Sequence, residues 1–379
     1  MTERVDVGEW VEFQWPYLMA FLGGVGRVNA LAEETGAFTR ARKIESPEVL
    51  LRLILMWAVA ERSLMDTAAA AAEAGLADVS DVALVKRFAK AGDWIAALTS
   101  ELLVDAQPRL PQGVRVRILD ATSITRAGKR GTDRRLHVGL DLGSNRIDAI
   151  ELTDVTGAES LERFSMRGGE VVIGDRAYGS RVGMSHVVRK GAFFVVRFGW
   201  SAVPLESADG QPFSLFEALR SLPEACAGEF AVRFVDPDDH LVEARLVAIR
   251  KSEPAAERAR HKALRERTKQ SQATVDLRTL EAAGYLFVLT NLPANISAES
   301  VLQLYRLRWQ IEMKFKTLKS LLHLDKVPAR HDETLRVYVL AKILVAFLID
   351  SLLDQADSFS PWGYPITPAQ QLANHPLSA

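Results

Sequence analysis

The period of the hydrophobic pattern changes near Val114, and this change most limits the folds open to the chain. Between Ser46 and about Leu103 the sequence is rich in alanine and has the pattern of short helices. From Val114 onward, Val114, Val116 and Ile118 alternate with arginines, which is the period of a half-buried strand. We therefore expect an N-terminal helical region that is followed by a sheet.

The strands and helices predicted after this change follow a recognisable order. Strands are predicted at 114–119, 136–142, 146–154, 170–175 and 192–198, with helices at 159–166 and 180–190. Three strands of antiparallel appearance, followed by helix, strand, helix and strand, is the element order of the ribonuclease H-like fold. The predicted fold class is therefore α/β, with a ribonuclease H-like mixed sheet and flanking helices.

The second half of the chain divides into three further segments. Residues 200–292 contain short strands at 229–235, 241–250 and 284–290 and a charged helix at 255–270, which is typical of an insertion. Ser297 is expected to cap long helices that run to about residue 353. The predicted divisions are an N-terminal helical region at 1–108, a ribonuclease H-like segment at 109–199 and 293–356, a β-rich insertion at 200–292, and a proline-rich tail at 357–379.

The N-terminal region begins its helices at clear capping residues. Ser46 precedes Pro47 at one predicted start, and Ser80 opens a helix that ends at Gly92. That second helix carries the basic residues Lys86, Arg87 and Lys90. Short helices in succession with a basic third member resemble a helix-turn-helix DNA reader. A plain helical bundle with a solvated basic face explains the same pattern.

Two aspartates stand where predicted strands end. Asp120 ends the first strand, and Asp175 ends the fourth. Asp175 lies between two glycines, in a segment that also holds Arg176 and Tyr178, and glycine permits the backbone to approach a ligand closely. Aspartate is also a common turn residue, so neither position alone identifies a functional site.

A third group of polar residues repeats with helical phase. Tyr305, Arg308, Glu312 and Lys319 stand at offsets of 0, 3, 7 and 14, which fall within about 60° on a helical wheel. Trp309 borders the same stripe. A phenol, a guanidinium, a carboxylate and an ammonium on one face are poor core material. An exposed face with salt bridges between neighbouring turns is the alternative explanation.

The chain resembles the DDE transposases of bacterial insertion sequences in two features. The first is the set of three acids, Asp120, Asp175 and Glu312. The second is the spacing Tyr-(2)-Arg-(3)-Glu-(6)-Lys, which Tyr305, Arg308, Glu312 and Lys319 follow. The resemblance is to the branch called "IS-four" and covers about residues 46–354. It implies a ribonuclease H-like catalytic domain, a mostly β insertion between the second Asp and the Glu, and an N-terminal DNA-binding region. The second-Asp motif departs mildly from the family, because Ala177 stands where glycine is commoner.

The resemblance also implies the chemistry. Asp120, Asp175 and Glu312 would hold two Mg²⁺ ions, with Mn²⁺ as a substitute, and Asp120 would bridge them. Water would then attack at the transposon end, and the released 3′-OH would attack target DNA. Arg and Lys are suited to phosphate, and an aromatic ring to a displaced base. The residues expected to contact DNA or its phosphates are Tyr305, Arg308, Lys319, Trp309, Arg176 and Tyr178.

Other residues near the candidate site have less specific patterns. Asp141 is the best rival to Asp120, although strand order favours Asp120. Arg126, Lys129, Arg130, Arg134 and Arg135 follow Asp120 and either track the DNA backbone or form a solvated loop. The seven histidines show no zinc-binding spacing.

Composition excludes several classes of protein. The formal net charge of −1 argues against nonspecific coating of nucleic acid, and the single cysteine excludes a disulfide framework. Neither of the two most apolar runs, at 50–60 and 337–353, is predicted to span a membrane.

We expect a cytoplasmic bacterial protein that binds double-stranded DNA, at terminal inverted repeats and target, as a homodimer in the synaptic complex. The rival hypotheses are a ribonuclease H-like nuclease without strand transfer and a non-catalytic, domesticated DNA-binding protein.

Overall fold

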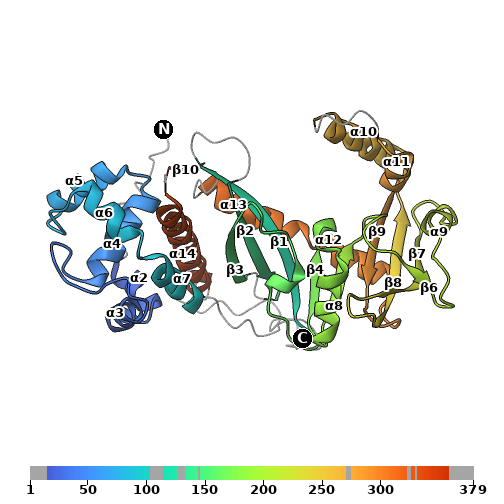
Figure 1. Cartoon of the computed structure of the whole chain (residues 1–379), viewed down its shortest axis with the longest axis horizontal. Coiled ribbons are helices and arrows are strands. Elements are labelled where there is room, and N and C mark those ends of the chain that lie inside the picture. The colour runs from blue at the N-terminus through green and yellow to red at the C-terminus, as the bar shows by residue number, and fades with distance from the viewer. Residues whose placement is uncertain are drawn as a thin grey trace, which may run out of the picture. The chain divides into compact units, whose positions relative to one another are not determined.

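The chain folds into two compact units (Figure 1). The computed structural model describes residues 15–102, 114–126, 133–143, 146–269, 275–321, 326–328 and 331–357. The helical unit contains residues 1–104, 124–133 and 316–379, and the sheet unit contains residues 105–123 and 134–315. The C-terminal helices are thus divided between the units, whereas the sequence assigned 293–356 to one catalytic segment. The functional domain boundaries remain a prediction.

Serine caps begin several helices of the helical unit. The side chains of Ser46, Ser63 and Ser80 each accept a hydrogen bond from the backbone N–H three residues on, which satisfies a donor that the first helical turn leaves unpaired. The helices are α2 (Trp15–Phe21), α3 (Gly24–Glu34), α4 (Pro47–Val59), α5 (Leu64–Glu73), α6 (Asp81–Phe88), α7 (Gly92–Glu101) and α14 (Asp332–Asp357). The predicted helix starts at Ser46 and Ser80 are confirmed.

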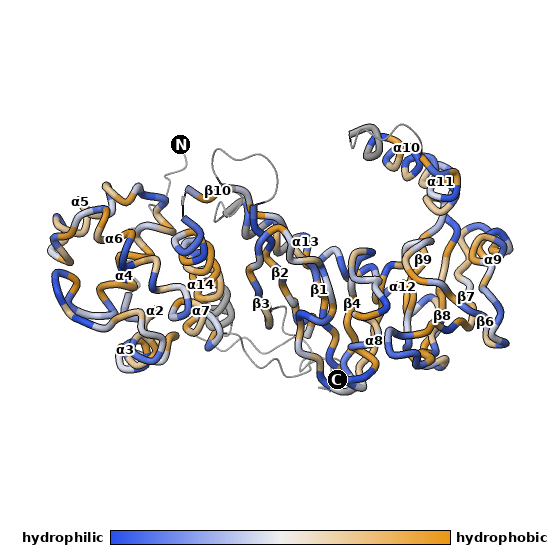
Figure 2. Tube along the Cα trace, viewed as in Figure 1, coloured by the Kyte–Doolittle hydropathy of each residue, from blue (hydrophilic) through white to orange (hydrophobic). Residues whose placement is uncertain are grey.

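The two most apolar segments, α4 and α14, form the core of this unit, and Figure 2 shows how apolar α14 is. The Trp57 ring of α4 packs against Tyr338 of α14 and Phe88 of α6, with ring centroids 4.9 and 5.1 Å apart. Lys342 interrupts the apolar run, and its buried ammonium donates to Glu61 at 2.8 Å. Burial inside a folded unit therefore accounts for both runs. None of the described helices is long and apolar enough to cross a lipid bilayer.

The connection between α5 and α6 is longer than a helix-turn-helix turn. It spans residues 74–80, whereas that motif joins its helices by three or four residues. In addition, α6 ends at Phe88, and Gly92 begins α7 instead of ending the preceding helix. This connection therefore gives no support to a helix-turn-helix in which α6 follows α5 as the reading helix.

The sheet unit holds a mixed sheet in which the described strands have the order β3-β2-β1-β4-β5-β9-β8-β7-β6. β2 and β3 pair antiparallel, whereas β1, β4 and β5 run parallel. The strands are β1 (Val116–Arg126), β2 (Arg134–Asp141), β3 (Arg146–Asp154), β4 (Val171–Gly174), β5 (Phe193–Arg197), β6 (Glu206–Ser207), β7 (Ala227–Val235), β8 (Leu241–Arg250) and β9 (Tyr285–Thr290). A short strand, β10 (Lys326–Val327), pairs with the end of β1.

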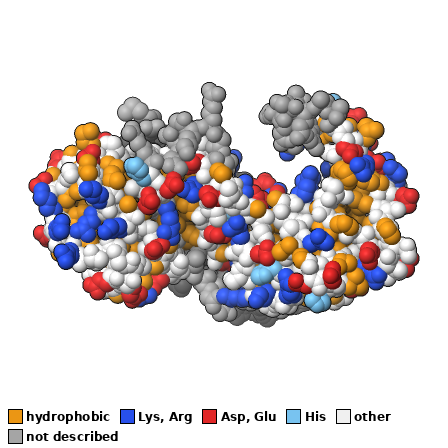
Figure 3. Space-filling view, viewed as in Figure 1, with side chains coloured by type: hydrophobic (Ala, Val, Ile, Leu, Met, Phe, Trp, Pro, Cys, Tyr) orange, Lys and Arg blue, Asp and Glu red, His pale blue; other side chains and the backbone are white. Residues whose placement is uncertain are grey.

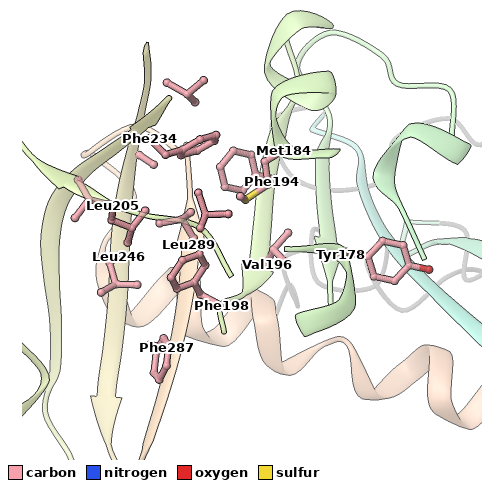
Figure 4. Packing of buried hydrophobic residues seen from close by; sticks show 14 of the residues in the cluster. Tyr178, Met184, Phe194, Val196, Phe198, Leu205, Phe234, Leu246, Phe287 and Leu289 are labelled. Atoms are coloured by element: carbon pink, nitrogen blue, oxygen red, sulfur yellow. The ribbon is translucent and has the colours of Figure 1, made fainter. Parts of the chain in front are cut away.

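The predicted insertion extends this sheet and shares its core. β9 pairs antiparallel with β5, so that the insertion strands continue the sheet from the edge of the parallel strands. Figure 4 shows Phe194 and Val196 of β5 among apolar residues of the insertion, including Leu289 of β9 and Leu246 of β8. The helices of the sheet unit are α8 (Arg181–Arg189), α9 (Leu215–Arg220), α10 (Glu253–Lys269), α11 (Leu277–Ala283) and α12 (Ala298–Arg306), and α13 (Trp309–Leu321) begins in it.

Three predicted elements differ in the structure. β1 continues past Asp120 to Arg126, because the alternating pattern persists through the buried Thr122 and Ile124. The helix expected at 159–166 is only a 3₁₀ turn, Leu161–Arg163, since Phe164 is already extended. The helix that was expected to carry the Tyr/Arg/Glu/Lys stripe is interrupted at residues 307–308, where backbone N–H groups donate three residues back.

Candidate active site

The pairing of β1 with β4 places the two candidate aspartates side by side. Leu119 pairs with Gly174 at the end of the parallel ladder, so the next residues on the two strands are Asp120 and Asp175. β4 ends there, and the Asp175 carboxylate caps the following 3₁₀ turn by accepting the Ala177 N–H at 2.8 Å. The predicted position of Asp175 directly after a strand is confirmed. The corresponding prediction for Asp120 was wrong, because β1 continues to Arg126 and only its pairing with β4 ends at Leu119.

Asp120 occupies a nearly buried position that disfavours its charge. Its side chain is 12% exposed. Burial raises the pKa of Asp120 to about 7, and the neighbouring Asp175 carboxylate adds to the rise, while the Ala121 N–H and Arg308 oppose it. A carboxylate in this setting is stabilised by a nearby cation.

Arg308 is the cation that the chain itself supplies. Its guanidinium lies 3.4 Å from the Asp120 carboxylate and also donates to Glu312. The structure therefore connects the first and third members of the predicted triad through one side chain. Tyr305 is buried, and its hydroxyl is hydrogen-bonded to Arg308, so three of the four stripe residues are in contact despite the interrupted helix.

Tyr178 faces the same carboxylates from inside the protein. Its ring is fully buried, and a side chain at Gly174 would collide with it, because an added Cβ would lie 2.9 Å from the Tyr178 Cβ. The hydroxyl has no hydrogen-bond partner among the described residues. Burial raises the pKa of Tyr178 above its usual value, and Asp120, Glu159 and Asp175 raise it further. This burial gives no support to the predicted DNA contact of Tyr178.

Glu159 is a further acidic group near the aspartates, and sequence reasoning missed it. Burial and the Asp175 charge raise the pKa of Glu159, and Arg135 lies 3.6 Å away. No spacing in the sequence marks this residue, because it is brought near by the turn between β3 and the 3₁₀ segment.

The other residues that were expected to contact DNA differ in exposure and position. Trp309 is 55% exposed at the start of α13, Arg176 is exposed directly after Asp175, and Lys319 is half-buried on α13. Arg135 is held by Glu159 and by the Gly157 carbonyl. Lys129, Arg130 and the side chain of Arg126 lie outside the described residues.

Asp141 has a different environment from Asp120. It is 1% exposed and accepts from Arg115 at 3.0 Å. Arg115 also pairs with Glu170 and Asp148, and Arg117 donates to the same two acids. This buried network of two arginines and three acids lies at the start of β1, on β2 and β3, and just before β4. Asp141 is thus part of a structural network of ion pairs.

A second group of potential metal ligands lies away from the predicted triad. Asp236, Asp238 and His240, at the turn between β7 and β8, have ligand atoms within 4.8 Å of one another. Asp236 accepts the backbone N–H groups of Asp238 and His240, and Arg189 pairs with Asp238. These hydrogen bonds and the ion pair explain the clustering of the three residues as part of the hairpin turn between β7 and β8.

Comparison with known proteins assigns the family. Residues 111–348 match the family described as Transposase DDE domain. The chain is 36% identical over 358 residues to InsL of insertion sequence element IS186A from Escherichia coli K12, covering 92% of this chain and 96% of InsL. It is 35% identical over 359 residues to the transposase for insertion sequence element IS421 from Escherichia coli, with the same coverage. The transposase for IS231F of Bacillus thuringiensis is 26% identical over 214 residues, which is 52% of this chain and 44% of that protein.

The chain belongs to the DDE transposases of insertion sequences, and it is a DNA transposase. The predicted family and enzyme class are confirmed. Enzymes with this domain act on DNA and depend on divalent metal ions. The donor set fits that requirement, because Asp120, Asp175 and Glu312 offer the oxygen ligands that hard cations prefer, and the buried Tyr178 hydroxyl beside them has no described partner.

Proposed function

We propose that the chain cuts DNA at the terminal inverted repeats of its insertion sequence and joins the 3′-OH ends to target DNA at the site formed by Asp120, Asp175 and Glu312. The observation that carries this proposal is the convergence of the three carboxylates: the β1–β4 register sets Asp120 beside Asp175, and Arg308 links Asp120 to Glu312. The order β3-β2-β1-β4-β5, with its antiparallel and parallel parts, supports a ribonuclease H-like domain.

In this proposal Asp120, Asp175 and Glu312 hold two Mg²⁺ ions, for which Mn²⁺ can substitute. When bound, the ions stabilise the charge on the attacking and leaving oxygens of phosphoryl transfer. Asp120 lies beside Asp175 and shares Arg308 with Glu312, so all three carboxylates would contribute to one metal site. Tyr178 and Gly174 keep the ends of the strands closely packed and so fix the direction of Asp175.

The stripe residues would position the DNA. Arg308 presents a planar fork to a phosphate, Tyr305 orients Arg308 through their hydrogen bond, and Lys319 and Arg176 supply further positive charge. Trp309 is exposed, which supports stacking on an unpaired base. Two ends have to be cut together, so we also propose that a homodimer forms the synaptic complex.

The helical unit would supply much of the DNA affinity. A groove of about 820 Å³ is lined by six basic residues, and Figure 3 shows Lys and Arg side chains gathered on this face of the unit. These residues are Arg40, Arg42, Lys43, Lys86, Arg87 and Lys90. Arg87 is fixed there, since it donates to the Arg40 carbonyl at 2.9 Å and lies over the Phe38 ring. A phosphate backbone is the partner that such a surface fits.

A nicking assay on DNA that bears the flanking inverted repeats tests the site. With Mg²⁺, we expect end-specific nicking and joining by the wild type, and loss of both in Asp120→Asn, Asp175→Asn and Glu312→Gln while DNA binding persists. Asp141→Asn is the matched control. Because Asp141 belongs to the buried ion-pair network, part of this variant can be unfolded, and we expect the folded protein to nick the DNA. Retained nicking in Asp120→Asn together with loss in folded Asp141→Asn would overturn the assignment. Nicking without joining would favour a nuclease.

A further inference from the structure

A second concave site lies beside the candidate active site, in the sheet unit. It is a cavity of about 420 Å³ between the end of β5, β8, β9 and the helices α10 and α11. Four of its lining side chains are cationic, and no described acid lines it. They are Arg176, Arg197, Lys251 and Lys262. A concentration of positive charge without a lining carboxylate is typical of an anion-binding site.

Lys251 is the central cation of this cavity. It is half-buried at the end of β8, and its ammonium donates to the Ala283 carbonyl at 2.7 Å. Burial lowers the pKa of Lys251 to about 8, and the charges of Arg197 and Arg176 lower it further. The three cations therefore repel one another across the cavity, and a bound anion would relieve this repulsion.

The walls of the cavity are partly aromatic, and contacts with neighbouring side chains hold one of the rings. Trp200 donates from its ring nitrogen to Thr279 at 3.2 Å, and the Arg278 guanidinium lies 4.3 Å from its ring centroid. Tyr285 and Phe287 of β9 contribute further ring surface. A site with fixed rings and several cations accommodates a phosphate together with the sugar or base attached to it.

The cavity is connected to the candidate active site through two residues. Arg176 lines it and directly follows Asp175 in the chain. Arg197 lines it and lies close enough to Tyr305 for its charge to lower the pKa of that hydroxyl, against the larger rise caused by burial. A DNA strand held at Asp175 and Tyr305 therefore has this cavity within reach.

We propose that the cavity binds a backbone phosphate, with its nucleotide, of the DNA strand that lies next to the scissile bond, and that Lys251 and Arg197 are its principal ligands. This inference rests on the proposed function, because it assumes that DNA occupies the neighbouring carboxylate site. It assigns to the insertion a defined contact with the substrate.

The first test measures the reactivity of Lys251 toward an amine-acylating reagent at pH 8, by mass spectrometry, on the full-length protein without divalent ions. DNA bearing the terminal repeat should slow acylation of Lys251 by about tenfold, as expected when a charged contact covers the amine. Lys190, exposed at the end of α8 and outside the cavity, is the control and should react equally with and without DNA. Unchanged Lys251 reactivity in the bound complex would overturn the proposal, and so would equal protection by dAMP, which would indicate a site for a free nucleotide.

The second test replaces single phosphates near the DNA end by neutral methylphosphonates and measures affinity. For the wild type and Lys190→Met we expect about a tenfold loss at one linkage, whereas Lys251→Met should bind natural DNA more weakly and lose nothing further there. Arg197→Met repeats the test if Lys251→Met is unfolded, and Lys251→Arg should recover the sensitivity. A linkage effect that is unchanged in both Met variants contradicts the proposal. Both tests measure binding, so their failure leaves the nicking assay of the carboxylates unaffected.

Discussion

Arg308 holds together two carboxylates that would otherwise repel each other. It lies 3.4 Å from Asp120 and donates to Glu312, and its side chain is 22% exposed. A divalent ion at the proposed site would compete with Arg308 for these carboxylate oxygens. Arg308 therefore has two candidate partners, the carboxylates in the protein alone and a phosphate when DNA and metal are bound.

This competition predicts a specific effect of Arg308→Met on metal binding. Without the guanidinium, Mg²⁺ should bind more tightly, so that the rise of the melting temperature on adding Mg²⁺ is larger than in the wild type, by roughly 2–5 °C. Thermal unfolding in EDTA and in a Mg²⁺ series measures the difference. The same variant combined with Asp120→Asn and Glu312→Gln is the control and should show no metal-dependent rise. An equal or smaller rise in Arg308→Met would show that Arg308 does not compete with the metal.

At the scale of elements, the strands β1, β2 and β3 are tied together by buried ion pairs. Arg115, directly before β1, and Arg117 of β1 donate to Asp141 of β2, Asp148 of β3 and Glu170 before β4. Removing one member of a buried pair leaves its partner charged in a nonpolar environment. This network supports the strands at the start of β1, where Arg115 and Arg117 precede Asp120 in the chain.

We expect Asp148→Asn to lower the free energy of unfolding by about 3–5 kcal/mol, the usual cost of breaking a buried ion pair. Asp238→Asn is the matched control, because Asp238 forms an exposed pair with Arg189, and it should cost less than about 1 kcal/mol. Urea denaturation followed by circular dichroism measures both. Similar losses for the two variants would mean that burial of the network contributes little.

The pairing of β2 with β3 has a pH dependence of its own. His137 of β2 is fully buried with its Nε2 3.0 Å from the Thr153 hydroxyl, and burial lowers its pKa to about 4, with Arg163 and Arg135 adding to the effect. The unfolded chain takes up a proton near pH 6.5, whereas the folded chain does so only near pH 4. The stability that neutral His137 provides is thus complete above pH 6.5 and is lost as the pH falls toward 4.

His137→Gln should remove the part of the pH dependence of stability that comes from His137. Between pH 7 and pH 5 the wild type should lose on the order of 2 kcal/mol more stability than the variant does, since one pKa unit corresponds to about 1.4 kcal/mol. Urea titrations at half-unit pH steps provide the measurement. Parallel pH profiles for the two proteins would contradict a neutral, buried His137.

At the scale of the whole molecule, a net charge of −1 conceals an uneven distribution. Six basic residues line the groove of the helical unit, and four cations line the cavity beside the candidate active site. The acids are concentrated elsewhere, in the carboxylate site, the buried network and surface pairs. A near-neutral chain can therefore present two cationic surfaces to DNA.

The contribution of the groove is measurable from the salt dependence of DNA binding. Replacing Arg42, Lys86 and Lys90, all exposed, by Ala should reduce the slope of log K against log salt by about 2–3, since each phosphate contact contributes about 0.9. The control replaces Arg181 and Lys190, exposed residues of the sheet unit outside the cavity, and should leave the slope unchanged. An unchanged slope in the groove variant would place the DNA contacts elsewhere.

The sequence by itself determined the local features of this protein. The serine caps, the strand that ends before Asp175 and the Tyr/Arg/Glu/Lys spacing depend on neighbouring residues, and alternation or capping chemistry is enough to predict them. The resemblance that these residues carry also gave the family correctly. The sequence-based prediction was wrong about two element boundaries. It ended β1 too early, whereas the strand continues to Arg126, and it missed the helix interruption at 307–308.

Only the tertiary structure decided which of these residues meet. The β1–β4 register brings Asp120 to Asp175 across 55 positions of sequence, and the Arg308 side chain reaches back 188 positions to Asp120. Asp141 was the best rival to Asp120 in the sequence, where only strand order favoured Asp120, and the burial of Asp141 beside Arg115 gives the two aspartates different environments. Glu159 and the cavity at Lys251 gave no local signal, because long-range packing brings their groups together from separate strands and helices.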